Sequence, residues 1–329
     1  MDLAESSRRH NGSDDELLRV LARVPELADR DLQLSPLTGG ITNRNFLVTP
    51  RAADGDAPWD RYVLRLAGND THLLGISREV EHAATAAAAG VGVGPEVVAF
   101  IRPEGYLVTR FIEGRPVSPE EMRNADRLRV LGGTLRRIHD GPPIPGLFVP
   151  YRIVEAYQAL ALARGVTIPA EFDLARSIAR RIELACVMVG VELRPCHNDL
   201  LNSNFIDDGK RLRIVDWEYA GMGDPFFDLG NVSINHDLNP EQDAALLSAY
   251  DSADVVDPIR LARLTLMRVI SDFREAMWGV LQQGISTLDV DFRAYGAEHF
   301  ERLLENASTS SFEHALRTVG EAQRTGRTR

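Results

Sequence analysis

The stretch His197 to Asn204 reads HNDLLNSN, and a short strand pattern, LRIVD, follows it and ends at Asp216. Turn-forming residues (DDGK) separate two strand-like segments after Asn204, so a hairpin is predicted there. The hairpin folds Asp216 back toward Asn204, and three oxygen-bearing side chains, Asp199, Asn204 and Asp216, then converge. Oxygen ligands of this kind are those that Mg²⁺ prefers in phosphoryl transfer.

The spacing H-x-D-x-x-x-x-N before a strand that ends in Asp is the catalytic arrangement of kinase-fold enzymes. In that arrangement the first Asp lies near the acceptor hydroxyl and the other two groups bind metal. Asp199 is therefore the candidate catalytic residue, and Asn204 and Asp216 are the candidate metal ligands. A polar surface loop is the alternative, and it leaves the hairpin unexplained. The chain has no G-x-x-x-x-G-K-[ST] sequence, so a P-loop is excluded.

The composition is that of a globular protein and excludes several classes. The 329 residues are 44% hydrophobic and 26% charged, and no apolar run reaches transmembrane length. A net charge of -11 argues against general affinity for nucleic acid and is compatible with a cationic small-molecule substrate. The first residues lack the apolar centre of a secretory signal, so a cytoplasmic protein is expected. Two cysteines, Cys186 and Cys196, are too few for a disulfide framework or a zinc site and are expected to be buried free thiols.

The N-terminal part of the chain alternates strand-like segments with one main helix. Residues 1–13 are polar and expected to be mobile. The pattern then predicts a helix at 14–27, strand-like segments at 34–48 and 60–66 that form a glycine-bearing hairpin, a helix at 77–89, and strands at 97–101 and 106–111.

Beyond Gly114 the pattern becomes helical. No internal repeat or low-complexity linker separates the two parts, so residues 1–109 and 110–329 are expected to be two lobes in contact. The last residues, 307–329, are rich in Ser, Thr and Arg and are expected to fray. Apolar residues recur at three- and four-residue spacing over 120–139, 152–164, 172–189 and most of 240–306.

Two groups in the N-terminal part are candidates for phosphate binding. Gly39 and Gly40 lie between strand-like segments and precede Thr42 and Asn43, so backbone amides and a hydroxyl can approach phosphates there. A Gly-Gly turn is also an ordinary hairpin turn, and that alternative stays open.

The second group is Arg65, a charged residue in the apolar strand YVLRL, together with Glu81 in the following helix. A buried charge needs a partner, and a strand cation held by a helix carboxylate grips the nucleotide phosphates in a kinase fold. An outward-facing arginine on a strand edge is the alternative.

Together these segments resemble the choline/ethanolamine kinase group, within the aminoglycoside-phosphotransferase-like kinases. The resemblance runs from about residue 37 to 304 and implies an α+β, two-lobed, protein-kinase-like fold. In that fold a small N-terminal lobe has an antiparallel sheet and one main helix, and a larger C-terminal lobe is mostly helical. The segments that carry it are GGITN, the arginine of VLRL, SREVE with the later GVGP, CHNDLLNSN, IVDWEYAGMGDPFFDLGN and SDFREAMWGVLQQGIS.

The resemblance implies an enzyme that transfers the γ-phosphate of ATP, with Mg²⁺, to the hydroxyl of a small cationic amino alcohol such as choline or ethanolamine. Asp199 matches the catalytic base, Asn204 and Asp216 match the magnesium ligands, and Arg65 matches the phosphate-gripping cation with Glu81 at its helix position. His197 is expected to hold the loop. The hinge whose backbone faces adenine is matched by Arg110, Phe111 and Ile112.

The acceptor pocket is expected to combine aromatic faces with carboxylates, because a quaternary ammonium donates no strong hydrogen bond. Tyr219 and Trp278 are the aromatic candidates, although Trp278 is also compatible with an ordinary core position. Asn235 occupies the place where eukaryotic choline kinases carry a substrate-facing Glu, and Glu275 occupies another aromatic place of the pocket. We hypothesise that Glu275, one helical turn before Trp278, supplies the missing negative charge. Asp228 is expected to fix a loop.

Other interpretations remain. An aminoglycoside, amino-sugar or thiamine kinase of the same fold is the first alternative, although the basic end EAQRTGRTR and Trp278 favour an amino alcohol. A nucleotide-binding pseudokinase is disfavoured because every expected catalytic position is occupied. The sequence leaves the acceptor, the oligomeric state and the pathway open.

Overall fold

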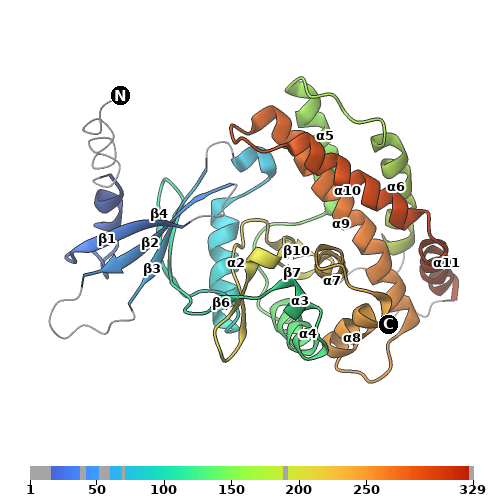
Figure 1. The fold of residues 1–329 in the computed structure, drawn as a ribbon, viewed down its shortest axis with the longest axis horizontal. Helices are drawn as coiled ribbons and strands as arrows, with labels where there is room; N and C mark the ends of the chain where they lie inside the picture. The colour runs from blue at the N-terminus through green and yellow to red at the C-terminus, as the bar shows by residue number, and fades with distance from the viewer. Residues whose placement is uncertain (1–15, 38–41, 52–59, 69–70, 188–191, 326–329) are drawn as a thin grey trace.

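The computed structural model describes residues 16–37, 42–51, 60–68, 71–187 and 192–325. Two lobes are visible in Figure 1, a small one built on a sheet and a large one built from helices. This is the α+β, two-lobed architecture expected from the sequence. The stretch 1–13, expected to be mobile, lies outside the described residues, as do Gly39 and Gly40.

The small lobe is a five-stranded antiparallel sheet with the strand order β1-β2-β3-β5-β4. The expectation of one strand-like segment over 34–48 is wrong, because the chain reverses there and pairs Leu37 with Asn45. The glycine-containing stretch thus separates two strands of the sheet. The strands are β1 (Leu32–Leu37), β2 (Arg44–Pro50), β3 (Tyr62–Leu66), β4 (Val97–Ile101) and β5 (Tyr106–Arg110).

A short helical segment closes the core of the sheet. Helical geometry is described for residues 16–21 and then gives way to turns, so the expected helix at 14–27 is shorter than predicted. Pro25 explains the early end, because it has no N–H and disfavours helical geometry at Val24. The apolar side chains Leu21 and Leu64 are fully buried in this core.

The main helix of the small lobe, α2 (Arg78–Gly90), begins at the N-cap Ser77, which accepts a hydrogen bond from the Val80 amide. One side of α2 stacks His82 on Phe100 of β4. Its alanine-rich side instead buries Ala84 and Ala88 in the core of the large lobe. The helix accordingly lies between the sheet and the large lobe in Figure 1.

The large lobe is built around one long helix, α9 (Pro258–Ile285), most of whose residues are buried. Helices α5, α6, α7, α8, α10 and α11 all contact it. The surrounding helices are α3 (Pro119–Met122), α4 (Ala125–His139), α5 (Pro150–Ala163), α6 (Phe172–Val187), α7 (Pro225–Asn235), α8 (Pro240–Asp251), α10 (Phe292–Ala307) and α11 (Ser310–Thr325).

Short strands and 3-10 turns carry the loops that face the small lobe. The stretch 120–139, expected as one helix, is divided between α3 and α4 because Asn124 caps the start of α4. The short elements are η1 (Thr71–Leu74), β6 (Arg115–Pro116), β7 (Arg194–Cys196), η2 (Asn202–Asn204), β8 (Phe205–Asp207), β9 (Leu212–Ile214) and β10 (Gly221–Gly223).

The expectation that residues 307–329 fray is wrong over most of this range. Residues 310–325 form α11, which packs on α6 and α9. The helix forms because its apolar residues recur on one face, while Ser, Thr and Arg lie on the other. Phe312, Ala315 and Val319 are buried by this packing. Among the helices that the structure describes, none is both long and apolar enough to cross a membrane.

Candidate active site

The hairpin predicted after the HNDLLNSN stretch is present. Strands β8 and β9 pair antiparallel, with Phe205 opposite Ile214. The Val215 amide donates to the Asn204 carbonyl at 3.0 Å, and the Asn204 side-chain nitrogen donates to the Asp199 carbonyl at 2.8 Å. Asp199, Asn204 and Asp216 are thereby held at one end of the hairpin.

Two residues of this region adopt left-handed backbone geometry, Asn198 with φ 67° and Asp216 with φ 68°. Such angles are uncommon outside glycine and persist where the surroundings hold them. Asn198 is held by its side-chain nitrogen, which donates to the Tyr219 carbonyl at 3.0 Å. Its backbone amide donates to Asp228 Oδ1 at 2.7 Å.

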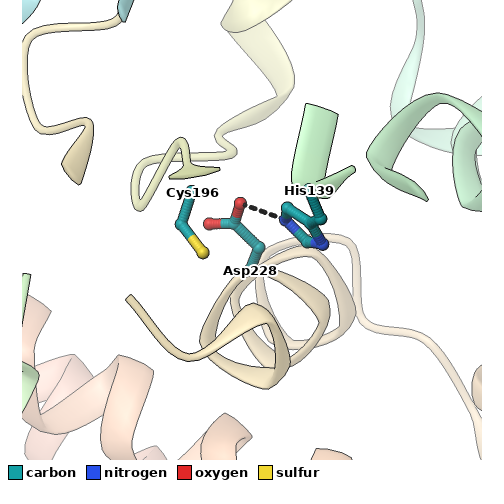
Figure 2. A group of neighbouring side chains, drawn as sticks. All are labelled: His139, Cys196 and Asp228. Atoms are coloured by element: carbon teal, nitrogen blue, oxygen red, sulfur yellow. Dashed lines mark hydrogen bonds and ion pairs between the residues drawn. The ribbon is translucent and has the colours of Figure 1, made fainter. Parts of the chain in front are cut away.

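Asp228 supports the loop that carries Asp199. Its Oδ2 accepts from the His197 amide at 2.8 Å and lies 3.0 Å from His139 Nε2, the contact drawn as a dashed line in Figure 2. Burial alone would raise the pKa of Asp228, but the hydrogen bond and charge of His139 and the amide of His197 outweigh burial and lower it. Asp228 thus fixes the loop, as expected from the sequence.

Cys196 completes a buried triad with His139 and Asp228, shown in Figure 2, whose ligand atoms lie within 4.8 Å of one another. Structural zinc sites usually have four ligands, with cysteine as the thiolate. Burial raises the pKa of the Cys196 thiol well above its ordinary value, and both oxygens of Asp228 already accept backbone N–H groups. We therefore interpret the three side chains as a support for the loop and not as a zinc site.

His197 has a structural role in the same loop. Its Nδ1 accepts from the Asp199 amide at 3.2 Å, and its Nε2 lies 3.0 Å from the Val215 carbonyl. An amide N–H only donates and a carbonyl only accepts, so the ring is the neutral tautomer with its proton on Nε2. Burial lowers the pKa of His197, which keeps it neutral.

Arg65 joins the two lobes at the centre of the site. Its guanidinium lies 2.7 Å from Glu81 of α2 and 2.6 Å from Asp216 of the large lobe. Burial would raise the pKa of Asp216, but the charge and hydrogen bond of Arg65 outweigh it and lower the pKa. The outward-facing alternative for Arg65 is wrong, because its side chain is 14% exposed and paired on both sides.

A second connection between the lobes was not predicted. Glu218, two residues after Asp216, accepts from the Asn43 side-chain nitrogen at 2.7 Å and from Arg78 at 3.3 Å. Burial and the nearby charge of Asp216 raise the pKa of Glu218 to about 7. The structure thus places Asn43 in a polar network with Arg78, while the Thr42 side chain makes no hydrogen bond among the described residues.

A cavity of about 420 Å³ lies between the lobes above this centre. Apolar walls come from Val63 and Leu107 of the sheet and from Ile206 and Trp217 of the large lobe, and none of these four was predicted. Strand alternation was a usable signal for Val63, because it shares a face with Arg65 two residues on. The predicted residues that line the cavity are Arg65, Glu81, Arg110, Phe111, Ile112, Asn204 and Asp216.

The donor set at the floor of the cavity fits a hard divalent cation. The Asn204 side-chain nitrogen is used by the Asp199 carbonyl, which leaves its Oδ1 available as an acceptor. Asp216, two residues after the end of β9, adds a carboxylate. One amide oxygen and one carboxylate, completed by phosphate oxygens, suit Mg²⁺.

On its other side, Asp199 adjoins a cluster of aromatic and charged side chains. The Trp278 indole N–H donates to the Tyr219 hydroxyl at 2.9 Å, and the Tyr295 hydroxyl donates to Glu275 Oε2 at 2.9 Å. The structure therefore brings Tyr219, Glu275 and Trp278 together. Asn235, at the end of α7, has no side-chain hydrogen bond to any of them within the described ranges.

Sequence reasoning missed Tyr295 of this cluster, and it also missed Arg274. Its Nη2 donates to the Asn198 carbonyl at 2.9 Å and lies 3.3 Å from Asp199 Oδ1, and its Nη1 donates to Glu275. Burial raises the pKa of Asp199 to about 8, with Arg274 opposing the rise and Glu275 adding to it. Two adjacent charges in the apolar stretch SDFREAMW were the available signal.

Comparison with known proteins identifies the family of the chain. Residues 33–262 match the model of the phosphotransferase enzyme family, APH. Protein LicA of Haemophilus influenzae is 27% identical over 214 residues, which cover 64% of this chain and 61% of LicA. The matched part thus spans less than two thirds of that relative. Ethanolamine kinase 1 of the mouse is 24% identical over 330 residues, covering 87% of this chain and 86% of the relative.

The solved structures agree. A choline/ethanolamine kinase family protein from Mesorhizobium loti superposes with a TM-score of 0.79 at 32% sequence identity, covering 94% of this chain and 99% of that one. The resemblance noted in the sequence is thereby confirmed. The chain belongs to the phosphotransferase enzyme family and, within it, to the choline/ethanolamine kinases, and it is a small-molecule kinase.

Proposed function

We propose that the chain is an ATP- and Mg²⁺-dependent kinase that phosphorylates the hydroxyl of choline or ethanolamine. One observation carries the proposal: Asp199 lies between two differently built sites. On one side Asn204 links it to the cavity that carries Asp216, and on the other Arg274 links it to an aromatic, acidic cluster.

The shape and lining of the cavity support the proposal that it binds a nucleotide. Its apolar walls from both lobes suit the flat faces of an adenine ring, and Phe111 and Ile112 supply backbone at the hinge. Arg65 is directed to the inner end, where its fork suits two phosphate oxygens. Asn204 and Asp216 would hold Mg²⁺, which neutralises the charge on the phosphates.

Asp199 is the proposed catalytic base. Its carboxylate accepts a hydrogen bond from the acceptor hydroxyl and orients the hydroxyl oxygen toward the γ-phosphorus. As the new O–P bond forms, the bond from that phosphorus to the β-phosphate bridging oxygen breaks, and the hydroxyl proton passes to Asp199. The products are ADP and the phosphorylated alcohol.

The charges on the acceptor side favour a substrate with one positive charge. Asp199 and Glu275 are two carboxylates and Arg274 is one cation, so the three groups together carry one negative charge when both acids are ionised, the state in which Asp199 acts as a base. Tyr219, Trp278 and Tyr295 supply aromatic surface beside them. A small alcohol with one ammonium group matches this charge and this surface better than a polycationic aminoglycoside.

The test of function is ATP consumption with choline, ethanolamine, methylated ethanolamines, amino sugars, thiamine and aminoglycosides. We expect turnover with choline or ethanolamine and expect the Asp199→Asn variant to lose at least about 10²-fold in kcat while it still binds nucleotide. The exposed Asp126→Asn change is the matched control. Turnover with aminoglycosides alone, or an Asp199→Asn variant as fast as the wild type, contradicts the proposal.

Nucleotide binding without turnover is the competing possibility of a pseudokinase. Thermal stabilisation by ATP should require Mg²⁺ if Asn204 and Asp216 hold the metal as proposed. The variant Asp216→Asn should then lose the Mg²⁺-dependent part of the stabilisation. Stabilisation that is equal with and without Mg²⁺, in a protein with no turnover on any acceptor, favours the pseudokinase.

A further inference from the structure

Arg274 lies in surroundings that proteins otherwise offer to a ligand cation. Its side chain is 2% exposed, and its guanidinium carbon lies 4.6 Å from the centre of the Tyr219 ring. Carboxylates flank it on both sides, Glu275 and Asp199. An aromatic face with carboxylates at its edge is the combination that recognises quaternary ammonium groups.

The cation is held inside the acceptor site and does not reach solvent. Arg274 fixes the Asn198 carbonyl with the same Nη2 that approaches Asp199, so its position is coupled to the catalytic loop. Its buried Nε has no hydrogen-bond partner among the described residues. Burying an unpaired donor has a cost in stability, which a role confined to packing would not require.

This placement changes what the acceptor site can bind. The guanidinium covers one face of the Tyr219 ring, so a trimethylammonium group cannot use that face. With Asp199 ionised, the site keeps one net negative charge, and its carboxylate oxygens can still accept hydrogen bonds, since Glu275 Oε2 receives only the Tyr295 hydroxyl. A primary ammonium can donate to such oxygens, whereas a quaternary ammonium cannot.

We propose that Arg274 is a specificity-determining residue that acts as an internal cation and makes the site select a primary ammonium alcohol over its quaternary counterpart. The inference rests on the proposed function, because it concerns the acceptor of the same reaction. The carboxylate of Glu275 then balances the charge of Arg274 as well as that of the substrate.

The experiment compares ethanolamine and choline in the full-length wild type and in Arg274→Met, which keeps the length of the side chain and removes its charge. In the wild type we expect kcat/KM for ethanolamine to exceed that for choline by about tenfold or more. In Arg274→Met we expect the ratio to shift toward choline by at least about tenfold, mainly through a lower KM for choline. Arg274→Lys, which keeps a cation, should retain most of the preference for ethanolamine.

Arg260→Met is the matched control. Arg260 lies on the same helix, pairs with Asp251 and is remote from the cluster, so the ratio should not change. A ratio in Arg274→Met within twofold of the wild type, or a wild type that prefers choline, overturns the inference. If Arg274→Met does not fold, the comparison moves to Glu275→Gln against the double variant Arg274→Met/Glu275→Gln, in which the same shift toward choline is expected.

Binding separates this inference from the proposed function. Titration calorimetry with methylammonium and tetramethylammonium needs no turnover. If the wild type phosphorylates neither alcohol yet binds methylammonium more tightly, and Arg274→Met reverses the order, the proposed reaction fails and the role of Arg274 stands. If turnover is found but the order of binding is the same in both proteins, the reaction stands and the role of Arg274 fails. A wild type that binds neither ion overturns it.

Discussion

Asp228 stabilises the loop that carries Asp199 through two backbone amides and a buried histidine. An asparagine there has one acceptor oxygen, so either orientation of its amide turns an N–H donor toward a backbone N–H. We expect Asp228→Asn to lower the free energy of unfolding by about 3 kcal/mol, because a buried charged network loses one partner. Urea unfolding at pH 7 measures this, with the exposed Asp126→Asn as control. A loss below that of the control contradicts the role.

The same carboxylate predicts a pH dependence. Its pKa in the folded protein is lowered, so its contribution is complete above the unfolded value of about 3.9 and is lost as the pH falls through the folded value. The stability difference between the wild type and Asp228→Asn should therefore be constant from neutral pH to about 5 and should narrow below about 3.9. Unfolding curves at several pH values test this, and a difference that widens on acidification would sink the assignment.

The two cysteines give a chemical test of burial. Burial raises the pKa of Cys186 to about 12 and that of Cys196 well above its ordinary value, so neither forms the reactive thiolate at pH 8. A thiol reagent should modify neither cysteine in the native protein and both in urea. Rapid native modification of either thiol would mean that its segment opens.

Among single residues, the sequence predicts those whose chemical type and spacing form a recognisable motif. Asp199, Asn204 and Asp216 were found from one motif and one hairpin, and the pairing of Arg65 with Glu81 was found from a charge in an apolar strand. Arg274 and Glu218 were not predicted because the hydrogen bonds that define their roles join residues 76 and 175 positions apart along the chain. The catalytic and binding roles of all these residues stay predictions until the variants are measured.

Among the elements, the crossing of α4 on α8 depends on a glycine. A Cβ at Gly132 would lie 2.8 Å from the Leu246 carbonyl and from the Tyr250 amide, while a Cβ at Gly133 would meet nothing within 4 Å. We expect Gly132→Ala to destabilise the protein by about 2 kcal/mol through overpacking. Its neighbour offers a matched control, because Gly133→Ala should stabilise by up to about 1 kcal/mol through helix propensity. Equal effects in thermal unfolding would contradict this packing.

Elements were predictable where one pattern dominated and failed where two competed. The strand-like segment at 34–48 is a β-rich run on both sides of a glycine pair, and pairing partners in the sheet decide that it is two strands. The last helix has a polar composition, and only its burial against α6 and α9 shows that its apolar stripe is sufficient. The polar composition correctly indicates an exposed face, but the prediction of a frayed end that was drawn from it is wrong.

In the whole molecule, α2 contacts β4 of the sheet and also buries its alanine face in the core of the large lobe. The Val93 carbonyl after the helix accepts from the Ile214 amide of β9 at 3.1 Å, and the Leu74 carbonyl before it accepts from the Tyr157 hydroxyl at 3.0 Å. Local opening is governed by buried contacts and hydrogen bonds. Amides of α2 should therefore exchange with deuterium about as slowly as those of α9, and more slowly than those of β1. Exchange of α2 at the rate of β1 would contradict this.

The position of α2 limits how chains of this fold can be recombined. Because α2 lies between β3 and β4 in the sequence but shares its buried face with the large lobe, no single cut separates the two halves of the molecule. A hybrid that takes residues 1–109 from one relative and the rest from another would bring together an alanine face and a docking surface that had not been matched. The unit that can be exchanged is therefore discontinuous: it is the sheet without α2. Grafting at the expected boundary of residue 109 would shift α2 and with it Glu81, the partner of Arg65.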